Sequence, residues 1–381
     1  MGQHEAPAEN VALFGITGAL GRELQAALEV DQDAIGRFIP VAGTGSAGAS
    51  VTWRGASLPV VAPGAVDPSK VDIAALACPA IVARREGPRL VKAGVRVVDA
   101  SGGLARTPVA SGLAGPARLR WPRLASCGDL ADETVIALPG DIASTLAPVL
   151  EALTAAAAPG VGLLPPVVTV DAVVLRSAAA AGRRGVQALS SQAVALLNYQ
   201  PVLDPAPFPA ALAFSAVAPA QDEALLAEGT AADELLALLP ALASVPIGIV
   251  PVLVSAFSGL AAVLTVRFRE TPSLARAEAA LLAHPDVEAA AALRDLDDVD
   301  LEDDDDSDAA PTGRPAPTAA EDGARGAAGL RDALDSDAVR VSSPSLGADG
   351  ALRVVVMADP LHRTAAACET IIARWLAEAS D

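Results

Sequence analysis

Three glycines near the start of the chain have the spacing of a turn that binds phosphate groups. They follow the apolar run at residues 10–14 and precede residues 22–29, which have the pattern of a helix. Glycine permits positive φ and close backbone approach, and a helix N-terminus offers free N–H groups to a pyrophosphate. We therefore predict a dinucleotide-binding turn formed by Gly15, Thr17, Gly18, Ala19, Leu20 and Gly21. A tight turn without a ligand is the alternative.

Few other residues could carry out nucleophilic or acid–base chemistry. The chain has three cysteines (Cys78, Cys127 and Cys368) and three histidines (His4, His284 and His362). So few cysteines exclude a disulfide framework and fit a reducing compartment. Cys127 lies in a loop-like Ser–Cys–Gly, where we expect an exposed structural thiol. A relocated Cys–His pair is the alternative.

The order of predicted elements indicates two domains. Strands at 10–14, 38–42, 71–77, 95–99 and 135–139 alternate with helices at 22–29, 83–93 and 144–157. Such alternation predicts a parallel sheet with right-handed crossovers. Strand-like runs at 167–175, 245–254, 260–268 and 352–358, with a final helix at 365–379, indicate a second, α+β domain.

The charge of the chain excludes several classes of partner. The 27 basic residues against 46 acidic ones give a net charge of −19. This balance argues against binding to nucleic acid or to anionic lipid, because both need clustered Lys and Arg. The acidic, polar start of the chain does not resemble a signal peptide, so we expect a cytoplasmic protein.

Two long segments need separate interpretation. Residues 235–266 carry no charge and are long enough to span a membrane. Pro240, Pro246 and Pro251 would break a helix, so we predict buried strands instead. Residues 295–336 begin with ten acids and no base, and we predict a disordered surface insert. The insert lacks the glycine and ligand spacing of an EF-hand loop, so no metal site is predicted.

Seven segments occur in an order that resembles the aspartate-semialdehyde dehydrogenase family. They are GITGALG (15–21), VDIAALA (71–77), KAGVRVVDAS (92–101), IALPGDIAST (136–145), AAAAGRRGVQAL (178–189), VPV (250–252) and VVVMADPLHRTAA (354–366). The resemblance implies an α/β protein with an N-terminal Rossmann NAD(P)-binding domain at 1–140. It further implies an α+β dimerisation domain at 141–358 of the type found in semialdehyde and glyceraldehyde-3-phosphate dehydrogenases. The last helix, within 359–381, would pack back on the first domain.

The four catalytic positions of that family are all changed in this chain. Aligned with the family motifs, the nucleophilic cysteine becomes Asp141 or Ala143, and the glutamine becomes Arg176. The substrate-binding arginine becomes Ile249 and the base histidine becomes Ala256. Neither Asp141 nor Ala143 can form a thioester. This pattern resembles the Usg-type branch of the family, whose members lack the cysteine.

The positions that hold the ends of the cofactor in the family are also changed. The arginine that meets the NADP 2′-phosphate becomes Gly45, and residues beside the nicotinamide become Pro360 and Thr364. Loss of that arginine removes a charge-assisted bond worth roughly 1.5–3 kcal/mol. We expect NAD or NADP binding to be weak or absent, without a preference for NADP.

Three hypotheses about function follow. The first is a catalytically inactive, homodimeric homologue that dimerises through residues 141–350 and retains at most nucleotide binding. The second is an active NAD(P)-dependent semialdehyde oxidoreductase of amino-acid biosynthesis with a rebuilt site. The third is a scaffold or interaction protein that acts through the acidic insert on a protein partner that the sequence does not identify.

Overall fold

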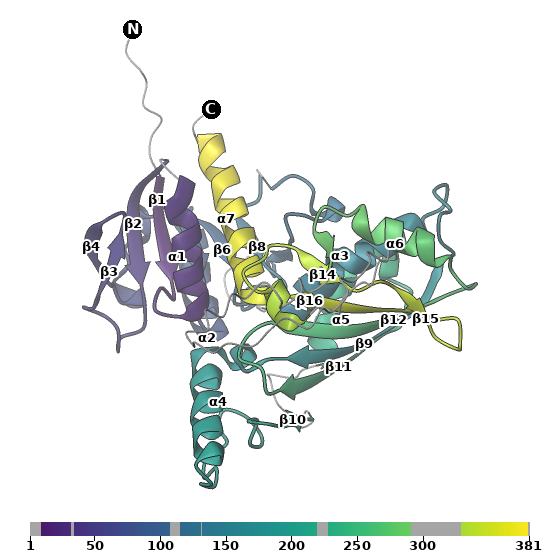
Figure 1. The fold of residues 1–381 in the computed structure, drawn as a ribbon. Helices are drawn as coiled ribbons and strands as arrows, with labels where there is room; N and C mark the ends of the chain where they lie inside the picture. The colour runs from purple at the N-terminus through teal and green to yellow at the C-terminus, as the bar shows by residue number, and fades with distance from the viewer. Residues whose placement is uncertain are drawn as a thin grey trace, which may run out of the picture.

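The chain forms two large sheets with helices packed against them (Figure 1), as seen in a computed structural model. The structure describes residues 9–31, 34–106, 115–130, 132–218, 228–290 and 329–379. The predicted acidic run and His4 lie outside these residues. The fold confirms the predicted class, a parallel-sheet Rossmann-like domain followed by a mixed-sheet domain.

The first sheet is parallel and has the strand order β2-β1-β5-β6-β8-β7. Its strands are β1 (Glu9–Phe14), β2 (Ile35–Val41), β5 (Ile73–Leu76), β6 (Arg96–Asp99), β7 (Arg118–Leu119) and β8 (Val135–Ala137). A hairpin of β3 (Ser50–Trp53) and β4 (Ala56–Pro59) follows β2. Helices α1 (Ala19–Asp31), α2 (Ala80–Lys92) and α7 (Pro360–Ala379) accompany this sheet.

The central strands of this sheet are buried on both faces, which explains their continuous apolar runs. In β1, Val11 and Leu13 belong to the core that includes Leu24 of α1 and Ile371 of α7. The alternate residues Ala12 and Phe14 belong to the core that includes residues of α2. Helix α7 packs beside α1 although the two are far apart in sequence (Figure 1).

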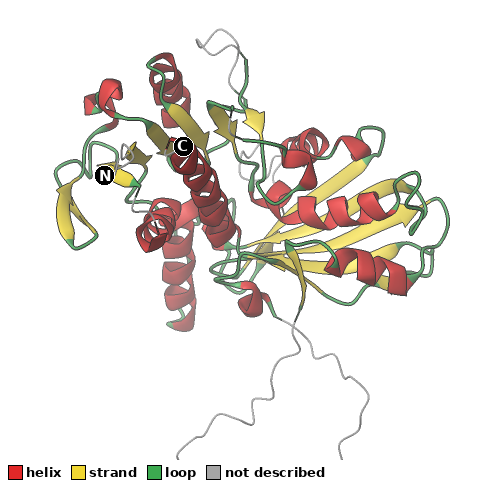
Figure 2. Cartoon of the chain, turned by 90° about the horizontal axis from the view of Figure 1, so that it is seen from above, coloured by secondary structure: helices red, strands yellow, loops and turns green. Residues whose placement is uncertain are grey.

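The second sheet is mixed and has the order β10-β11-β9-β12-β16-β14-β13, with β15 paired to β16. Its strands are β9 (Val167–Arg176), β10 (Ala216–Val217), β11 (Ile247–Val254), β12 (Leu260–Phe268), β13 (Val287–Ala289), β14 (Val339–Val341), β15 (Ser345–Leu346) and β16 (Leu352–Ala358). Helices α3 (Asp141–Ala156), α5 (Glu228–Leu238) and α6 (Leu274–Leu282) lie over the sheet, and α4 (Gly182–Leu197) projects away from it (Figures 1 and 2).

The uncharged stretch at 235–266 ends α5 and then forms β11 and β12, as the prolines predicted. Alternate residues of these strands are buried, as expected for strands with one covered face. Among the described residues, none of the helices has the length and apolar composition that crossing a membrane requires.

Two helices and the insert differ from the predicted boundaries. Helix α3 begins at Asp141 rather than at residue 144. Helix α7 begins at Pro360 rather than at residue 365, because Asp359 caps it by accepting the Leu361 N–H at 3.0 Å. Residues 330–333, near the C-terminal end of the predicted insert, form a 3₁₀ turn in which Ala333 is buried, so the prediction of disorder is wrong for these residues. The part of the predicted insert at 295–328 lies outside the described residues.

We predict that replacing residues 296–328 with a short Gly–Ser linker leaves the fold intact. This segment has few large apolar side chains and can therefore bury little surface. Circular dichroism should be unchanged, and the melting temperature should shift by less than about 4 °C. A control that also removes residues 329–336 deletes the buried turn and should be less stable. Aggregation or lost helicity in the shorter deletion would contradict the prediction.

Candidate functional site

The glycine turn between β1 and α1 is shaped by close backbone packing. Gly15 has φ of +97°, and a β-carbon there would lie 2.0 Å from the Ala77 carbonyl oxygen. A β-carbon at Gly21 would lie 2.2 Å from the Gly15 carbonyl oxygen. Larger residues would push the turn away from the ends of β1 and β5, where open α/β sheets bind ligands.

This turn fits the pyrophosphate of a dinucleotide. Gly18 N–H donates to the Gly15 carbonyl at 2.8 Å, and Arg22 N–H donates to the Gly18 carbonyl at 3.2 Å. The first-turn N–H groups of α1, at Ala19, Leu20 and Gly21, precede the hydrogen bonding within the helix and can face an anion. Gly45 lies in the loop after β2, and a β-carbon there would meet nothing within 4 Å. This position therefore has room for a ligand but no charged side chain to bind a 2′-phosphate.

The start of α3 carries an ion pair where the family nucleophile was expected. Arg176, the last residue of β9, donates to Asp141 Oδ2 from Nε at 3.0 Å and from Nη2 at 2.7 Å. The other oxygen, Oδ1, accepts the Ile142 N–H at 3.0 Å. The Arg176 side chain is 11% exposed and that of Asp141 is 28% exposed. Both carboxylate oxygens are therefore engaged within the protein, at a helix end whose dipole favours negative charge.

A second ion pair lies beside the first and was not predicted from the sequence. Glu234 of α5 accepts the Gly140 N–H at 2.8 Å and lies 3.2 Å from Arg106. Burial raises the pKa of the Glu234 carboxyl, and the charge of Asp141 raises it further, whereas the Gly140 N–H and Arg106 oppose the rise. The sequence signal that could have revealed this ion pair is the carboxylate at position 234, immediately before the uncharged run. A carboxylate that becomes buried needs a partner.

The other predicted positions are apolar and belong to the protein core. Ala143 is fully buried in α3, and Ile249 is 5% exposed in β11, in the same core as Leu235 of α5. Ala256 is partly buried just after β11, and its carbonyl accepts the Ala178 N–H at 2.9 Å. Of the predicted catalytic positions, the structure joins Asp141 and Arg176 directly, and the remaining three provide no group that transfers protons.

The three thiols are free but are not activated as nucleophiles. The expectation of an exposed Cys127 is wrong, because it is 5% exposed within the core, where burial raises the pKa of its thiol. Burial, with a smaller effect of Asp99, raises the pKa of Cys78 to about 12 and also raises that of Cys368. Reactive cysteines need the opposite shift.

Each of the two described histidines lies beside a carboxylate and has a structural role. His284 lies 3.1 Å from Glu151, and His362 lies 2.8 Å from Glu23. Among the described residues, no group of three or more His, Cys, Asp or Glu side chains could hold a metal ion.

Sequence comparison identifies the first domain. Residues 10–140 match the family described as the semialdehyde dehydrogenase NAD-binding domain. The chain is also 38% identical over 90 residues to the aspartate-semialdehyde dehydrogenase of Legionella pneumophila. This match covers 24% of the chain and spans about a quarter (26%) of that curated relative.

Structural comparison extends the likeness of fold to nearly the whole chain. A probable aspartate-semialdehyde dehydrogenase from Pseudomonas aeruginosa is similar with a TM-score of 0.75 and 24% identity, over 97% of this chain and 98% of that one. Aspartate-semialdehyde dehydrogenase II from Vibrio cholerae, complexed with ASA, has a TM-score of 0.75 and 19% identity over the same shares. The family model identifies residues 10–140 as a semialdehyde dehydrogenase NAD-binding domain, and the solved structures show that nearly the whole chain shares their fold.

Proposed function

We propose that this protein is a catalytically inactive, cytoplasmic homologue of aspartate-semialdehyde dehydrogenase, of the Usg type that lacks the catalytic cysteine. The observation that carries the proposal is the Asp141–Arg176 ion pair at the start of α3. The resemblance implies a nucleophile at one of these two positions and a residue that orients the reaction intermediate at the other. In this chain both positions carry charged side chains that bind each other.

The chemistry of an active member needs a thiolate, a base and a cation that binds the substrate carboxylate. Asp141 is not free to attack a substrate, because Arg176 binds its Oδ2 and the Ile142 N–H binds its Oδ1. Arg176 is likewise committed to Asp141, and Ile249 and Ala256 supply neither cation nor base. Arg106 remains half-exposed, but Glu234 already pairs with it.

A dinucleotide, if bound, would lie against the turn at 15–21, with its pyrophosphate at the first turn of α1. It would supply a hydride acceptor. The residues of this chain would hold its phosphates through backbone N–H groups, whereas Gly45 offers no charge to a 2′-phosphate. Binding is therefore proposed to be weak, and a role in sensing a nucleotide would need no reaction.

We predict that the purified protein does not reduce NAD or NADP in the presence of aspartate semialdehyde and phosphate. Loss of nucleophile, base and carboxylate-binding cation together should lower the rate by several orders of magnitude. The Vibrio cholerae enzyme, assayed in parallel, is the positive control for substrate quality.

Turnover above the no-enzyme control would contradict this prediction, and two variants would show its origin. Loss of that turnover in Cys127→Ser would assign it to a relocated thiol. Loss in Asp141→Asn, with Cys127→Ser still active, would assign it to a rebuilt oxidoreductase site.

We further propose that the protein is a homodimer formed through the open face of the second sheet. Four valines, Val250, Val173, Val263 and Val355, stand in register across β11, β9, β12 and β16. Their side chains are between 37% and 48% exposed, whereas the alternate residues face the core. Such a contiguous apolar row is rarely left open in a monomer and is typical of subunit interfaces.

We predict a dimer of twice the 38.0 kDa chain mass by light scattering, and a monomer for Val263→Glu. A carboxylate in the middle of the row would have to be desolvated in the interface. Ile81→Glu is the matched control, because Ile81 is 72% exposed at the start of α2 in the first domain and should leave the dimer unchanged. A wild-type mass near that of one chain, at micromolar concentration, would reject the dimer.

A further inference from the structure

His362 lies where three parts of the protein meet. It is in the first turn of α7, where α7 runs beside α1 (Figure 1). Its Nδ1 lies 2.8 Å from Oε1 of Glu23, in α1, and its Nε2 makes an ion-pair contact of 3.1 Å with Oδ1 of Asp337, just before β14. One imidazole thus faces a carboxylate on each of its two nitrogens.

The partners of a histidine reveal which protonation state its surroundings favour. His284 provides a contrast within the same chain. Its Nδ1 accepts the Asp286 N–H at 3.1 Å, so that nitrogen is unprotonated and Nε2 carries the hydrogen toward Glu151. His362 forms a hydrogen bond with the Glu23 carboxylate through Nδ1, and the Asp337 carboxylate lies 3.1 Å from Nε2 without the alignment of a hydrogen bond. Two carboxylates so close to one ring stabilise a positive charge on it. The geometry therefore favours imidazolium at His362.

We infer that His362 is a proton-dependent link between α1 and the second domain. We refer to the contacts Glu23–His362–Asp337 as the His362 bridge. When the ring is protonated, both ends attract. When it is neutral, the charge attraction to Asp337 is lost and the link between α1 and the segment before β14 weakens. Since Glu23 lies in the second turn of α1, the helix that begins at the glycine turn, the protonation state acts on the element that would hold a dinucleotide phosphate.

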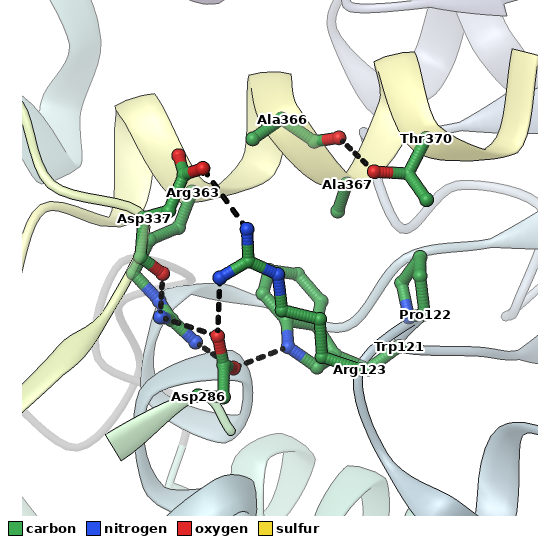
Figure 3. A pocket seen from close by; sticks show the side chains of 9 residues that line it. All are labelled: Trp121, Pro122, Arg123, Asp286, Asp337, Arg363, Ala366, Ala367 and Thr370. Atoms are coloured by element: carbon green, nitrogen blue, oxygen red, sulfur yellow. Dashed lines mark hydrogen bonds and ion pairs between the residues drawn. The ribbon is translucent and has the colours of Figure 1, made fainter. Parts of the chain in front are cut away.

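The other charged residues around the ring are bound to partners of their own. His362 is therefore the residue whose protonation controls the bridge. Asp359 caps α7 and adds a third carboxylate nearby. Arg123 holds the other oxygen of Asp337 at 2.9 Å. Arg363, the next residue of α7, turns into the core, where it binds Asp286 at 2.8 Å and the Asp337 carbonyl (Figure 3).

The pH dependence follows from these neighbours. Burial lowers the pKa of the His362 ring, but Glu23, Asp337 and Asp359 outweigh burial and raise the pKa above its ordinary value. A raised pKa in the folded state means that the stabilisation is complete below the unfolded-state pKa of about 6.5. It is lost as pH rises through the folded-state pKa. The bridge is therefore closed in mildly acidic solution and weakens in alkaline solution.

The direct test is a pH titration of the histidine ring signals of the full chain by NMR, assigned with His362→Gln and His284→Gln. We expect the pKa of His362 to lie above about 6.5 and to fall in both Glu23→Gln and Asp337→Asn. A pKa at or below the ordinary value, or one that neither variant changes, would overturn the inference.

A second measurement follows the bridge through stability. His362→Gln keeps a polar side chain that cannot titrate, so the gap in melting temperature between wild type and variant reports the proton-dependent part. We expect this gap to be largest near about pH 6 and to shrink by roughly half or more near about pH 9. A gap that is constant or grows with pH would overturn the inference. If His362→Gln does not fold, the titration in Glu23→Gln still decides. Neither test depends on whether the protein is an active dehydrogenase.

Discussion

The ion pair between Asp141 and Arg176 is the contact on which the arrangement of the site depends. It joins the last residue of β9 to the first residue of α3, so the second sheet and the helix that starts beside the first sheet are fixed together. Arg176 is nearly buried and needs a carboxylate, and Asp141 suits both the arginine and the helix N-terminus.

Helix α7 packs against α3, the helix that begins at Asp141. Arg363 is fully buried on α7 and reaches Asp286 of the second domain at 2.8 Å, while its guanidinium stacks 5.2 Å from the Trp121 ring centroid. Trp121 donates to the same aspartate at 3.1 Å. Beside these groups lies a small cavity with room for about one water molecule (Figure 3). Because breaking a buried pair leaves an uncompensated charge, this cluster resists relative movement of the two domains.

Much of this architecture could be predicted from local sequence patterns, because central parallel strands are apolar throughout and glycine turns have few alternatives. The features that could not be predicted depend on contacts between distant segments. Glu234 and Arg106 meet only because α5 lies against the start of α3. Cys127 is buried because distant core residues cover a loop that is polar in sequence. Helix α7 begins at Pro360 because Asp359 caps it. The proline after Asp359 made this helix start difficult to predict from the sequence.

The same reasoning applies to the site itself. Motif alignment drew attention to Asp141 and Arg176, but spacing in sequence could not show that their side chains bond to each other across 35 positions. Once bonded, they form one structural element that joins β9 to α3.

A double-mutant cycle with Asp141→Asn and Arg176→Gln tests this claim most directly. We predict that each single variant lowers the free energy of unfolding by about 1–3 kcal/mol and that the double variant loses clearly less than their sum. The exposed pair Arg267–Asp349, with side chains 45% and 37% exposed, is the matched control and should show a much smaller coupling. Additive losses at Asp141 and Arg176, or a coupling no larger than that of the control, would contradict the account.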